Sequence, residues 1–410
     1  MIWVLRLFLA LGALLLVQSA ASLLDGFRFL GYVRRSRRGP LGDFAPPAAV
    51  LIPCKGLDAD FERNLSSFLA QDYPRYQLIF IVASEDDAAC APLRKRLDQR
   101  SASTAGGGPA RALVVAGFAE SRGEKVHNLL RGLEAVDPAA EVLVFADMDA
   151  RPERDWLRSL VAPLGDAALT VSSGFRWYLP GEGFVSRVRA AWDTSIATLL
   201  GDHDHNFAWG GSMAIRRADF RRLAVAERYW ARTVSDDYAL TRAVREARGR
   251  IRFEPRCLLA SREESSFAEF LRWANRQIII TRVYASPLWW LGLAAHLFYC
   301  LTMALGLAVL FLPGLAMAPR SVVAMLLAAI LLLGAAKGYL RTVVARDLFP
   351  EEGEALARHG AAYWQLTPLV PWLMLVNFLT AGFTRRIEWR GTRYELVSAE
   401  EVRVLGRGPS

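Results

Sequence analysis

Four long apolar stretches stand out along the chain, and between the first two lies a long segment with the charges, glycines and prolines of a soluble domain. Each stretch is long enough to cross a membrane as a helix, which takes roughly 20 mostly apolar residues. The pattern predicts an enzyme-sized domain held by membrane helices on either side of it. The four stretches are 1–24, 287–313, 321–340 and 364–383.

The first apolar stretch admits two interpretations. Small residues at 19–21 would suit a signal peptidase, so the stretch could be a cleaved leader. Its start carries only Arg6, however, whereas the basic sequence RRSRR follows at 34–38. Because positive charge collects on the cytoplasmic side of a membrane, this asymmetry favours an uncleaved anchor over 1–30, with the large domain in the cytoplasm.

The last apolar stretch is ambiguous. If all three C-terminal stretches crossed the membrane, the basic tail would end outside, against the positive-inside tendency. Pro368 and Pro371 interrupt the final stretch, so a re-entrant or interfacial segment remains an alternative to a full crossing. The expected domains are a cytosolic domain over 45–265, an interfacial amphipathic helix over 266–286, membrane helices over 287–383 and a basic tail over 384–410.

Within the soluble segment, short apolar runs alternate with helical patterns. Phe61, Leu65 and Phe68 have helical spacing between the first two runs, and 123–136 repeats this spacing between the last two. Such alternation predicts an α/β fold whose mainly parallel sheet is covered on both faces, with ligands bound outside the carboxyl ends of the strands. The runs are AAVLIPC, YQLIFIV, ARALVVAG and EVLVFA.

Composition narrows the class of protein further. Apolar residues make up 53% of the chain, above the usual globular share. The four cysteines have no pairing or zinc spacing, which fits a reducing cytosol. The net charge of +9 is best explained by attraction to anionic lipid, and no nucleic-acid motif is present. The glycine-rich stretch 101–110 lacks the lysine of a phosphate loop and is expected to be a surface linker.

Three pairs of acidic residues are the candidate chemistry. Converging carboxylates repel each other unless a cation joins them, and hard oxygen ligands favour Mg²⁺ or Mn²⁺. An Asp-x-Asp at a strand end suits a metal that neutralises a leaving diphosphate, the alternative being solvated acids at the surface. The third pair begins a helical pattern, where aspartates also serve as caps. The pairs are Asp86 and Asp87, Asp147 and Asp149, and Asp236 and Asp237.

Other polar and aromatic residues could complete a site. Lys125, at a predicted helix start, could meet a diphosphate or could be a solvated lysine. Gly210 and Gly211 would allow a ligand to approach the backbone, and Trp209 could stack on a sugar, the alternative being a tight turn. The pair His203 and His205 has no third soft ligand, so a polar loop is preferred to a zinc site.

Several of these segments resemble one known family. IPCKGLDADFERNLSSFLAQDYPRYQLIFIVASEDDAA resembles the start of membrane glycosyltransferases of the ceramide glucosyltransferase family. VFADMDA resembles that family's metal and nucleotide aspartates, and SDDYALT its acid-Asp-Tyr motif. LRWANRQ is similar to the end of its (Gln/Arg)-x-x-Arg-Trp motif, and IEWRGTRY to related bacterial lipid glycosyltransferases of the hopanoid type. The ordered set covers about residues 48 to 396.

This resemblance implies a nucleotide-sugar-binding domain of the glycosyltransferase A type, together with transmembrane helices. It implies that Asp86 binds uracil, that Asp147 contacts the nucleoside and that Asp149 binds the metal. Asp237 is implied as the base that takes the proton from the acceptor hydroxyl.

The Arg-Trp motif departs from the family at one position. Arg272 and Trp273 match and are implied to contact the nucleotide sugar, although such a pair also anchors helices at membrane interfaces. Glu269 stands where the family has glutamine or arginine, so no role is carried over to it.

The resulting expectation is an inverting hexosyltransferase that moves sugar from a UDP-sugar to a hydroxyl of a membrane lipid such as ceramide or a hopanoid. High alanine, arginine and glycine usage indicates a bacterial source, hence a multi-pass protein of the inner membrane. The alternatives are a processive polysaccharide synthase, a nucleotidyltransferase, or a non-catalytic membrane scaffold that keeps a degenerate transferase fold.

Overall fold

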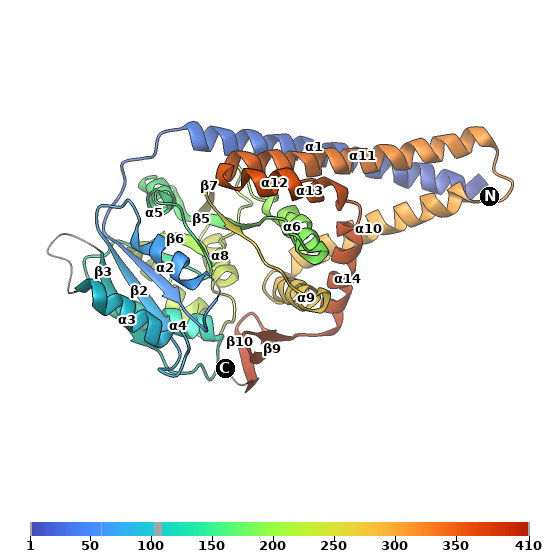
Figure 1. Ribbon diagram of the computed structural model, residues 1–410. Helices are drawn as coiled ribbons and strands as arrows, with labels where there is room; N and C mark the ends of the chain where they lie inside the picture. Colours follow the sequence, from blue (N-terminus) through green and yellow to red (C-terminus); the bar gives the residue numbers. More distant parts are fainter. Residues whose placement is uncertain (1, 59, 102–108, 409–410) are drawn as a thin grey trace. The chain divides into compact units, whose positions relative to one another are not determined.

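The computed structural model describes residues 2–58, 60–101 and 109–408, and the chain divides into two compact units (Figure 1). Most of the linker expected at 101–110 therefore lies outside the described residues. Each unit is described by itself. Unit 1 comprises Met1–Arg35, Trp177–Gly201 and Ser261–Thr384, and unit 2 comprises Ser36–Arg176, Asp202–Ala260 and Arg385–Ser410.

Unit 2 is built on a seven-stranded sheet of order β3-β2-β1-β4-β6-β5-β7. The first four of these strands are mutually parallel, whereas β6 is antiparallel to both β4 and β5. The predicted α/β fold with a mainly parallel sheet is thus confirmed. The strands are β1 Ala48–Pro53, β2 Tyr76–Val82, β3 Ala110–Val115, β4 Val142–Ala146, β5 Leu169–Tyr178, β6 Ser212–Arg216 and β7 Arg250–Ser261.

Helices cover both faces of this sheet because successive strand side chains point to opposite sides. Val50 and Ile52 pack into one buried cluster, and Leu51 between them packs into the other. The helical patterns predicted on either side of these strands are confirmed. Helices α2 (Phe61–Leu69), α3 (Cys90–Ser101) and α5 (Trp156–Val161) line the first face, and α4 (Glu124–Gly132), α7 (Arg217–Arg222) and α8 (Asp236–Glu246) line the second.

The parallel pairing of β2, β1 and β4 positions the acidic segments. Pro53 of β1 lies beside Ile81 of β2, and Leu51 lies beside Phe145 of β4. Because parallel neighbours end at the same edge of a sheet, the segments after these strands meet at one rim. Both predicted acid pairs, after β2 and after β4, belong to this rim.

A second, three-stranded antiparallel sheet also belongs to unit 2, where a basic tail was expected. Its Tyr394 hydroxyl accepts a hydrogen bond from the backbone N–H of Glu124 at 3.2 Å, and Arg407 donates to the carbonyl of Ala119. These bonds fix the C-terminal segment to the loop before α4 and to the start of that helix. The strands are β8 Arg386–Trp389, β9 Thr392–Ser398 and β10 Glu401–Arg407.

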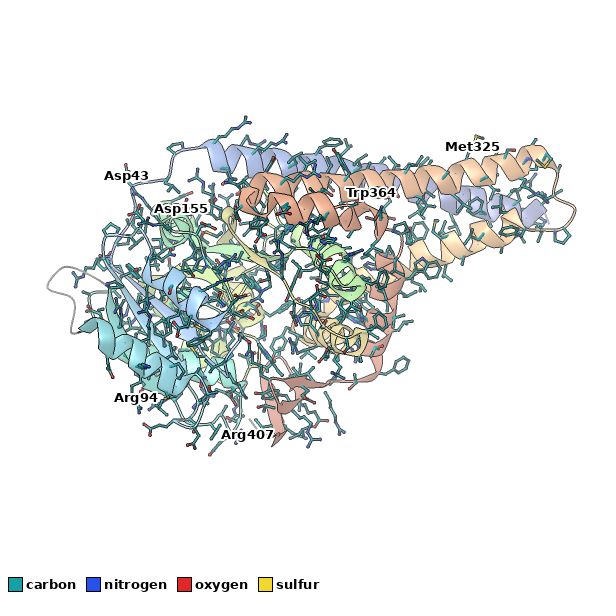
Figure 2. The ribbon with its side chains drawn as sticks, viewed as in Figure 1. Asp43, Arg94, Asp155, Met325, Trp364 and Arg407 are labelled. Atoms are coloured by element: carbon teal, nitrogen blue, oxygen red, sulfur yellow. The ribbon has the colours of Figure 1, made fainter. Side chains whose placement is uncertain are left out.

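Unit 1 contains, among the described residues, three helices long and apolar enough to cross a membrane: α1 (Ile2–Arg38), α10 (Ser286–Leu310) and α11 (Met317–Leu348). They share one buried apolar cluster, and many apolar side chains on them face outward, such as Met325 at 63% exposure (Figure 2). Outward apolar side chains are what a helix in contact with hydrocarbon requires.

The last predicted span forms a shorter helix, α14 (Val370–Phe383), of 14 residues. Pro371 lies in its first turn, which explains why the helix starts there rather than at the beginning of the apolar stretch. The remaining described helices of unit 1 are α6 (Phe184–Ala197), α9 (Phe267–Tyr284), α12 (Gly353–His359), α13 (Ala362–Gln365) and the short η4 (Pro350–Glu352). Unit 2 has the short helical segments η1 (Leu133–Ala135), η2 (Ala162–Gly165) and η3 (Val225–Tyr229).

Gly174 of β5 provides a test of the sheet. A Cβ at this position would overlap the backbone carbonyl of Cys257 in the neighbouring β7. A backbone carbonyl cannot change rotamer to relieve the overlap, as a side chain could. We expect Gly174→Ala to lower the free energy of unfolding by about 1–3 kcal/mol or more, measured by thermal unfolding in detergent.

The matched control is Gly353→Ala, because that helical glycine has no atom within 4 Å of an added Cβ. It should leave stability unchanged or raise it by up to about 1 kcal/mol, since alanine favours helix. Equal losses in both variants would contradict the packing of β5 against β7.

Candidate active site

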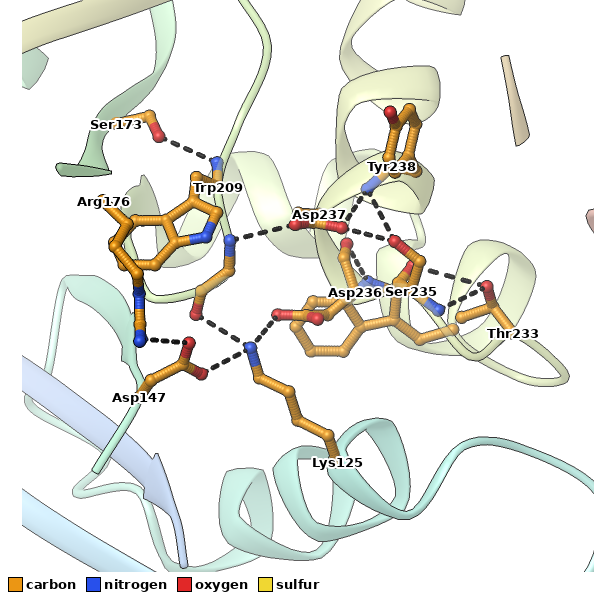
Figure 3. A network of polar contacts seen from close by, with 12 residues as sticks. Lys125, Asp147, Ser173, Arg176, Trp209, Thr233, Ser235, Asp236, Asp237 and Tyr238 are labelled. Atoms are coloured by element: carbon orange, nitrogen blue, oxygen red, sulfur yellow. Dashed lines mark hydrogen bonds and ion pairs between the residues drawn. The ribbon is translucent and has the colours of Figure 1, made fainter. Parts of the chain in front are cut away.

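The ammonium group of Lys125 joins three segments of unit 2 (Figure 3). Its Nζ lies 2.8 Å from Asp147 Oδ1 and 3.2 Å from Asp236 Oδ2. It also donates a hydrogen bond of 3.1 Å to the carbonyl of Gly210. The side chain is only 14% exposed, so it is not the solvated lysine that the sequence left as an alternative. Lys125, Asp147 and Gly210, three residues predicted from the sequence, thus lie together with Asp236 of the third acid pair.

The local structure explains why these groups meet. Lys125 lies in the first turn of α4, Asp147 directly follows β4, Gly210 precedes β6 and Asp236 begins α8. Burial would lower the pKa of Lys125, but Asp147 and Asp236 outweigh it and raise that pKa, so the group stays charged. One positive charge therefore compensates two carboxylates from different elements.

Asp236 is the most enclosed acid of the site. Its side chain is 2% exposed, and burial, together with the charges of Asp237 and Asp147, raises its pKa to about 6 despite Lys125. A buried carboxylate with one cationic partner is suited to holding structure and charge balance, rather than to receiving a substrate.

Asp237, the predicted base, is held differently. Its Oδ1 accepts a 2.8 Å hydrogen bond from the backbone N–H of Tyr238 and a second from the Ser235 hydroxyl. Its Oδ2 accepts from the backbone N–H of Gly210 at 3.3 Å. Ser235 also caps α8. The carboxylate is half-buried, so it is oriented by three donors and still accessible.

Asp149 is neutralised by arginine. Arg176 of β5 makes two contacts with it, Nη2 to Oδ1 at 2.6 Å and Nη1 to Oδ2 at 3.2 Å, and the same Nη2 lies 3.5 Å from Asp147 Oδ2. Burial opposes ionisation of Asp149, but Arg176 outweighs it and holds the pKa at about 2. The two aspartates therefore converge on one cationic group.

The predicted glycine turn is required by crowding. A Cβ at Gly210 would overlap Asp236 and lie 2.7 Å from Lys125 Nζ, and one at Gly211 would overlap the ring of Trp209. Trp209 itself stacks against Arg176, whose guanidinium carbon lies 5.3 Å from the ring centroid. The glycines thus let the backbone pass beside the charged network.

The acid pair after β2 is divided in role. Asp87 Oδ1 accepts 2.9 Å hydrogen bonds from the backbone N–H groups of Gly56 and Ala89, which ties the turns after β1 and β2 together. Asp86 is exposed beside Ser84. Its predicted contact with uracil stays a prediction.

The C-terminal sheet contributes an arginine that sequence reasoning did not single out. Arg390 lies between β8 and β9, donates a 2.8 Å hydrogen bond to the Lys55 carbonyl and lies 3.5 Å from Asp58 and 3.7 Å from Asp149. It occupies the left-handed region at φ 44°, before Gly391 at φ 77°. Left-handed backbone costs a non-glycine residue about 1–2 kcal/mol.

Arg272 and Trp273 lie on α9 in unit 1. Arg272 is exposed, and Trp273 packs edge-on against Trp192 with centroids 5.1 Å apart, under the guanidinium of Arg189 at 4.9 Å. Glu269 has a structural explanation, because it forms a capping box with Ser266 at the start of α9. The predicted contacts of Arg272 and Trp273 with the nucleotide sugar stay predictions.

The chemistry of the acids fits a divalent cation. Among the described residues no cluster of three or more histidine, cysteine, aspartate or glutamate side chains could enclose a metal, and His203 and His205 lie exposed on a loop. Asp147 and Asp149, however, already share one cationic group, and Mg²⁺ typically takes one or two carboxylates plus phosphate oxygens and water.

The family model for glycosyl transferase family 21 matches residues 13–402, nearly the whole chain. The chain belongs to this family. The predicted resemblance to the ceramide glucosyltransferase family is therefore confirmed, and the protein is a glycosyltransferase that uses a nucleotide sugar.

Two solved structures illustrate the likeness. A mannosyltransferase from Pyrobaculum calidifontis, in complex with GDP-Man and Mn²⁺, is 17% identical, covers 91% of this chain and 97% of its own, and gives a TM-score of 0.46. Glucosyl-3-phosphoglycerate synthase from Mycobacterium tuberculosis, in complex with phosphoglyceric acid, is also 17% identical, covers 62% of this chain and 82% of its own, and gives a TM-score of 0.37.

In this family 21 member, Asp236 gives a pH dependence that can be measured. Above about pH 4 the unfolded chain has lost this proton, whereas the folded chain keeps it up to about pH 6. The folded state therefore loses stability relative to the unfolded state as pH rises between these values. We expect Asp236→Asn to remove this part of the pH dependence of the unfolding temperature.

Asp43→Asn serves as the control, because Asp43 is exposed and lies outside the network (Figure 2). It should follow the wild type across pH 4–8. Parallel curves for wild type and Asp236→Asn would show that the Asp236 proton is not held by the fold.

Proposed function

We propose that this family 21 glycosyltransferase transfers a sugar from a UDP-sugar to a hydroxyl group of a membrane lipid, with inversion at the anomeric carbon. The observation that carries the proposal is the link between the predicted base and the Asp-x-Asp motif. Asp237 accepts from Gly210 N–H, the Gly210 carbonyl accepts from Lys125, and Lys125 pairs with Asp147. One residue, Gly210, therefore fixes the distance between the base and the donor side.

The donor side carries the charge that a diphosphate needs. Arg176 and Arg390 both lie against Asp149, and Lys125 lies against Asp147. Guanidinium groups bind phosphate with paired hydrogen bonds. Asp147 and Asp149 would hold a divalent cation, Mg²⁺ or Mn²⁺, which when bound offsets the negative charge of the leaving diphosphate.

The reaction is a single displacement. The acceptor oxygen forms a bond to the anomeric carbon while the bond from that carbon to the diphosphate oxygen breaks. The acceptor proton passes to Asp237, and the electron pair of the broken bond leaves with the diphosphate. Attack from the face opposite the leaving group inverts the configuration. The three hydrogen bonds on Asp237 orient its carboxylate for this transfer.

The membrane helices support a lipid acceptor and a cytoplasmic catalytic unit. Asp202–Ala260, which precedes α9 and α10, and Arg385–Ser410, which follows α14, belong to one unit, so an even number of crossings separates them. Helices α10 and α11 supply two crossings, whereas α14, at 14 residues, is shorter than the roughly 20 that a span takes. With α1 this makes three spans, and the basic residues at 34–38 lie on the inner side of a bacterial membrane.

The first test is nucleotide release by the purified protein with Mn²⁺ or Mg²⁺, across several UDP-sugars, with ceramide, hopanoid or diacylglycerol. Asp237→Asn should lower lipid-dependent release by about 10²–10⁴-fold because the proton has no acceptor. Donor binding, measured by calorimetry, should stay within a factor of a few.

The control is Asp204→Asn, which removes a carboxylate that is 70% exposed on a loop of the same unit. Its release rate should match the wild type. Loss of donor binding in Asp237→Asn would move Asp237 to the donor site. Release from no donor under any condition would favour a non-catalytic scaffold.

Arg390 gives a separate test of the donor side. Asparagine tolerates left-handed backbone better than arginine, so Arg390→Asn should leave the unfolding temperature unchanged or higher. Donor affinity should fall about tenfold or more, because one charge-assisted contact with the diphosphate is lost.

The control on the same sheet is Arg386→Gln, whose side chain is 71% exposed and pairs with Glu395. It should bind donor as the wild type does. Unchanged donor affinity in Arg390→Asn would remove Arg390 from the donor site and leave it as a structural contact.

A further inference from the structure

The side chain of Arg176 lies against the carboxylates that the proposed function assigns to a divalent cation. Its Nη2 lies 2.6 Å from Asp149 Oδ1 and 3.5 Å from Asp147 Oδ2, and its Nη1 donates a 3.2 Å hydrogen bond to Asp149 Oδ2. The remaining oxygen, Asp147 Oδ1, lies 2.8 Å from Lys125 Nζ. Each of the four carboxylate oxygens of the Asp-x-Asp motif is therefore in contact with a cation of the protein itself.

The backbone around the Asp-x-Asp motif keeps its carboxylates in place. The backbone N–H of Asp147 donates a 3.4 Å hydrogen bond to the Gly211 carbonyl, and the carbonyl of Asp147 accepts one of 3.1 Å from Ala150. The side chains of Asp147 and Asp149 are 27% and 31% exposed, so a cation from solution can reach them. Arg176 reaches them through a long side chain with many rotamers. The arginine, rather than the aspartates, is therefore the group that can move.

The ring of Trp209 gives the guanidinium of Arg176 a second contact. The guanidinium carbon lies 5.3 Å from the ring centroid, and Figure 3 shows the side chain reaching past this ring to Asp147. A cation–π contact is made with the face of the ring and does not direct the guanidinium to one particular acceptor. Arg176 can therefore turn from the aspartates to another anion while it stays beside Trp209.

A divalent cation and Arg176 compete for these carboxylates. Mg²⁺ binds oxygen at about 2.0–2.1 Å, and at that distance from Asp149 Oδ1 it would repel a guanidinium that lies 2.6 Å from the same oxygen. Binding of the metal therefore requires Arg176 to leave. A diphosphate gives the arginine another partner, because two phosphate oxygens match the paired N–H groups of a guanidinium as carboxylate oxygens do.

We propose that Arg176 couples the binding of the metal to the binding of the nucleoside diphosphate, an inference that rests on the proposed function. Without nucleotide, the guanidinium occupies Asp147 and Asp149 and competes with the metal. With the diphosphate bound, Arg176 pairs with phosphate oxygens and the two carboxylates can take the metal. Metal and diphosphate then raise each other's affinity by the same factor. The donor and its cation therefore enter the site together.

The test measures Mn²⁺ binding to the full-length protein in detergent, from the electron paramagnetic resonance signal of free Mn²⁺, without UDP and at saturating UDP. Arg176→Met should bind Mn²⁺ about tenfold or more tightly than the wild type without UDP, because the competing charge-assisted contacts are lost. At saturating UDP the two proteins should agree within a factor of a few. The factor by which UDP raises Mn²⁺ affinity should therefore fall about tenfold.

Two further variants separate competition from the loss of a positive charge or of the fold. Arg390 lies 3.7 Å from Asp149, but its hydrogen bonds go to Asp58 and the Lys55 carbonyl. Arg390→Asn should therefore raise Mn²⁺ affinity much less than Arg176→Met does. Arg176→Lys keeps the charge but loses the paired donors, so its Mn²⁺ affinity without UDP should lie between those of the wild type and Arg176→Met.

The outcomes distinguish this coupling from the proposed function. Equal Mn²⁺ affinity of the wild type, Arg176→Met and Arg176→Lys without UDP would overturn the coupling. So would a rise in the Mn²⁺ affinity of Arg176→Met that is equal with and without UDP, because that is a general charge effect. Both results leave the proposed sugar transfer intact. A wild type that binds neither Mn²⁺ nor UDP would contradict the proposed function, and the coupling with it.

Discussion

The ammonium of Lys125 is the contact on which the catalytic unit depends. Asp147 after β4, the Gly210 carbonyl before β6 and Asp236 at the start of α8 all reach it within 3.2 Å. Without a cation, two carboxylates at this depth would repel each other and lose their hydration. The sheet edge, the glycine turn and α8 thus hold a common position because they share one positive charge.

The remaining charges follow from that arrangement. Arg176 and Arg390 compensate Asp149, whereas Asp237 is held by three neutral donors and remains accessible. The arrangement therefore separates the proposed donor side, where arginines lie against one carboxylate, from the proposed base, which is held by neutral donors. This asymmetry suits the proposed displacement, in which negative charge grows on the leaving side while a proton arrives on the other.

The sequence patterns predicted those features of the fold and site that depend on residues close together in the sequence. Apolar runs identify the parallel strands, and the acids at the strand ends and the glycine turn can be recognised from the residues themselves. Arg176 and Arg390 escaped prediction because their partner, Asp149, is 27 and 241 residues away in sequence, and no periodicity connects them. The segment IEWRGTRY stands out only through resemblance. Glu269 departs from its motif for a local reason, the capping box.

The two units differ in how a buried cation is compensated. In unit 2 the buried Lys125 meets two carboxylates, so the network is stable before any ligand arrives. In unit 1 the buried Arg341 has no such partner among the described residues, although Arg34 and Asp347 on the same helix pair are matched.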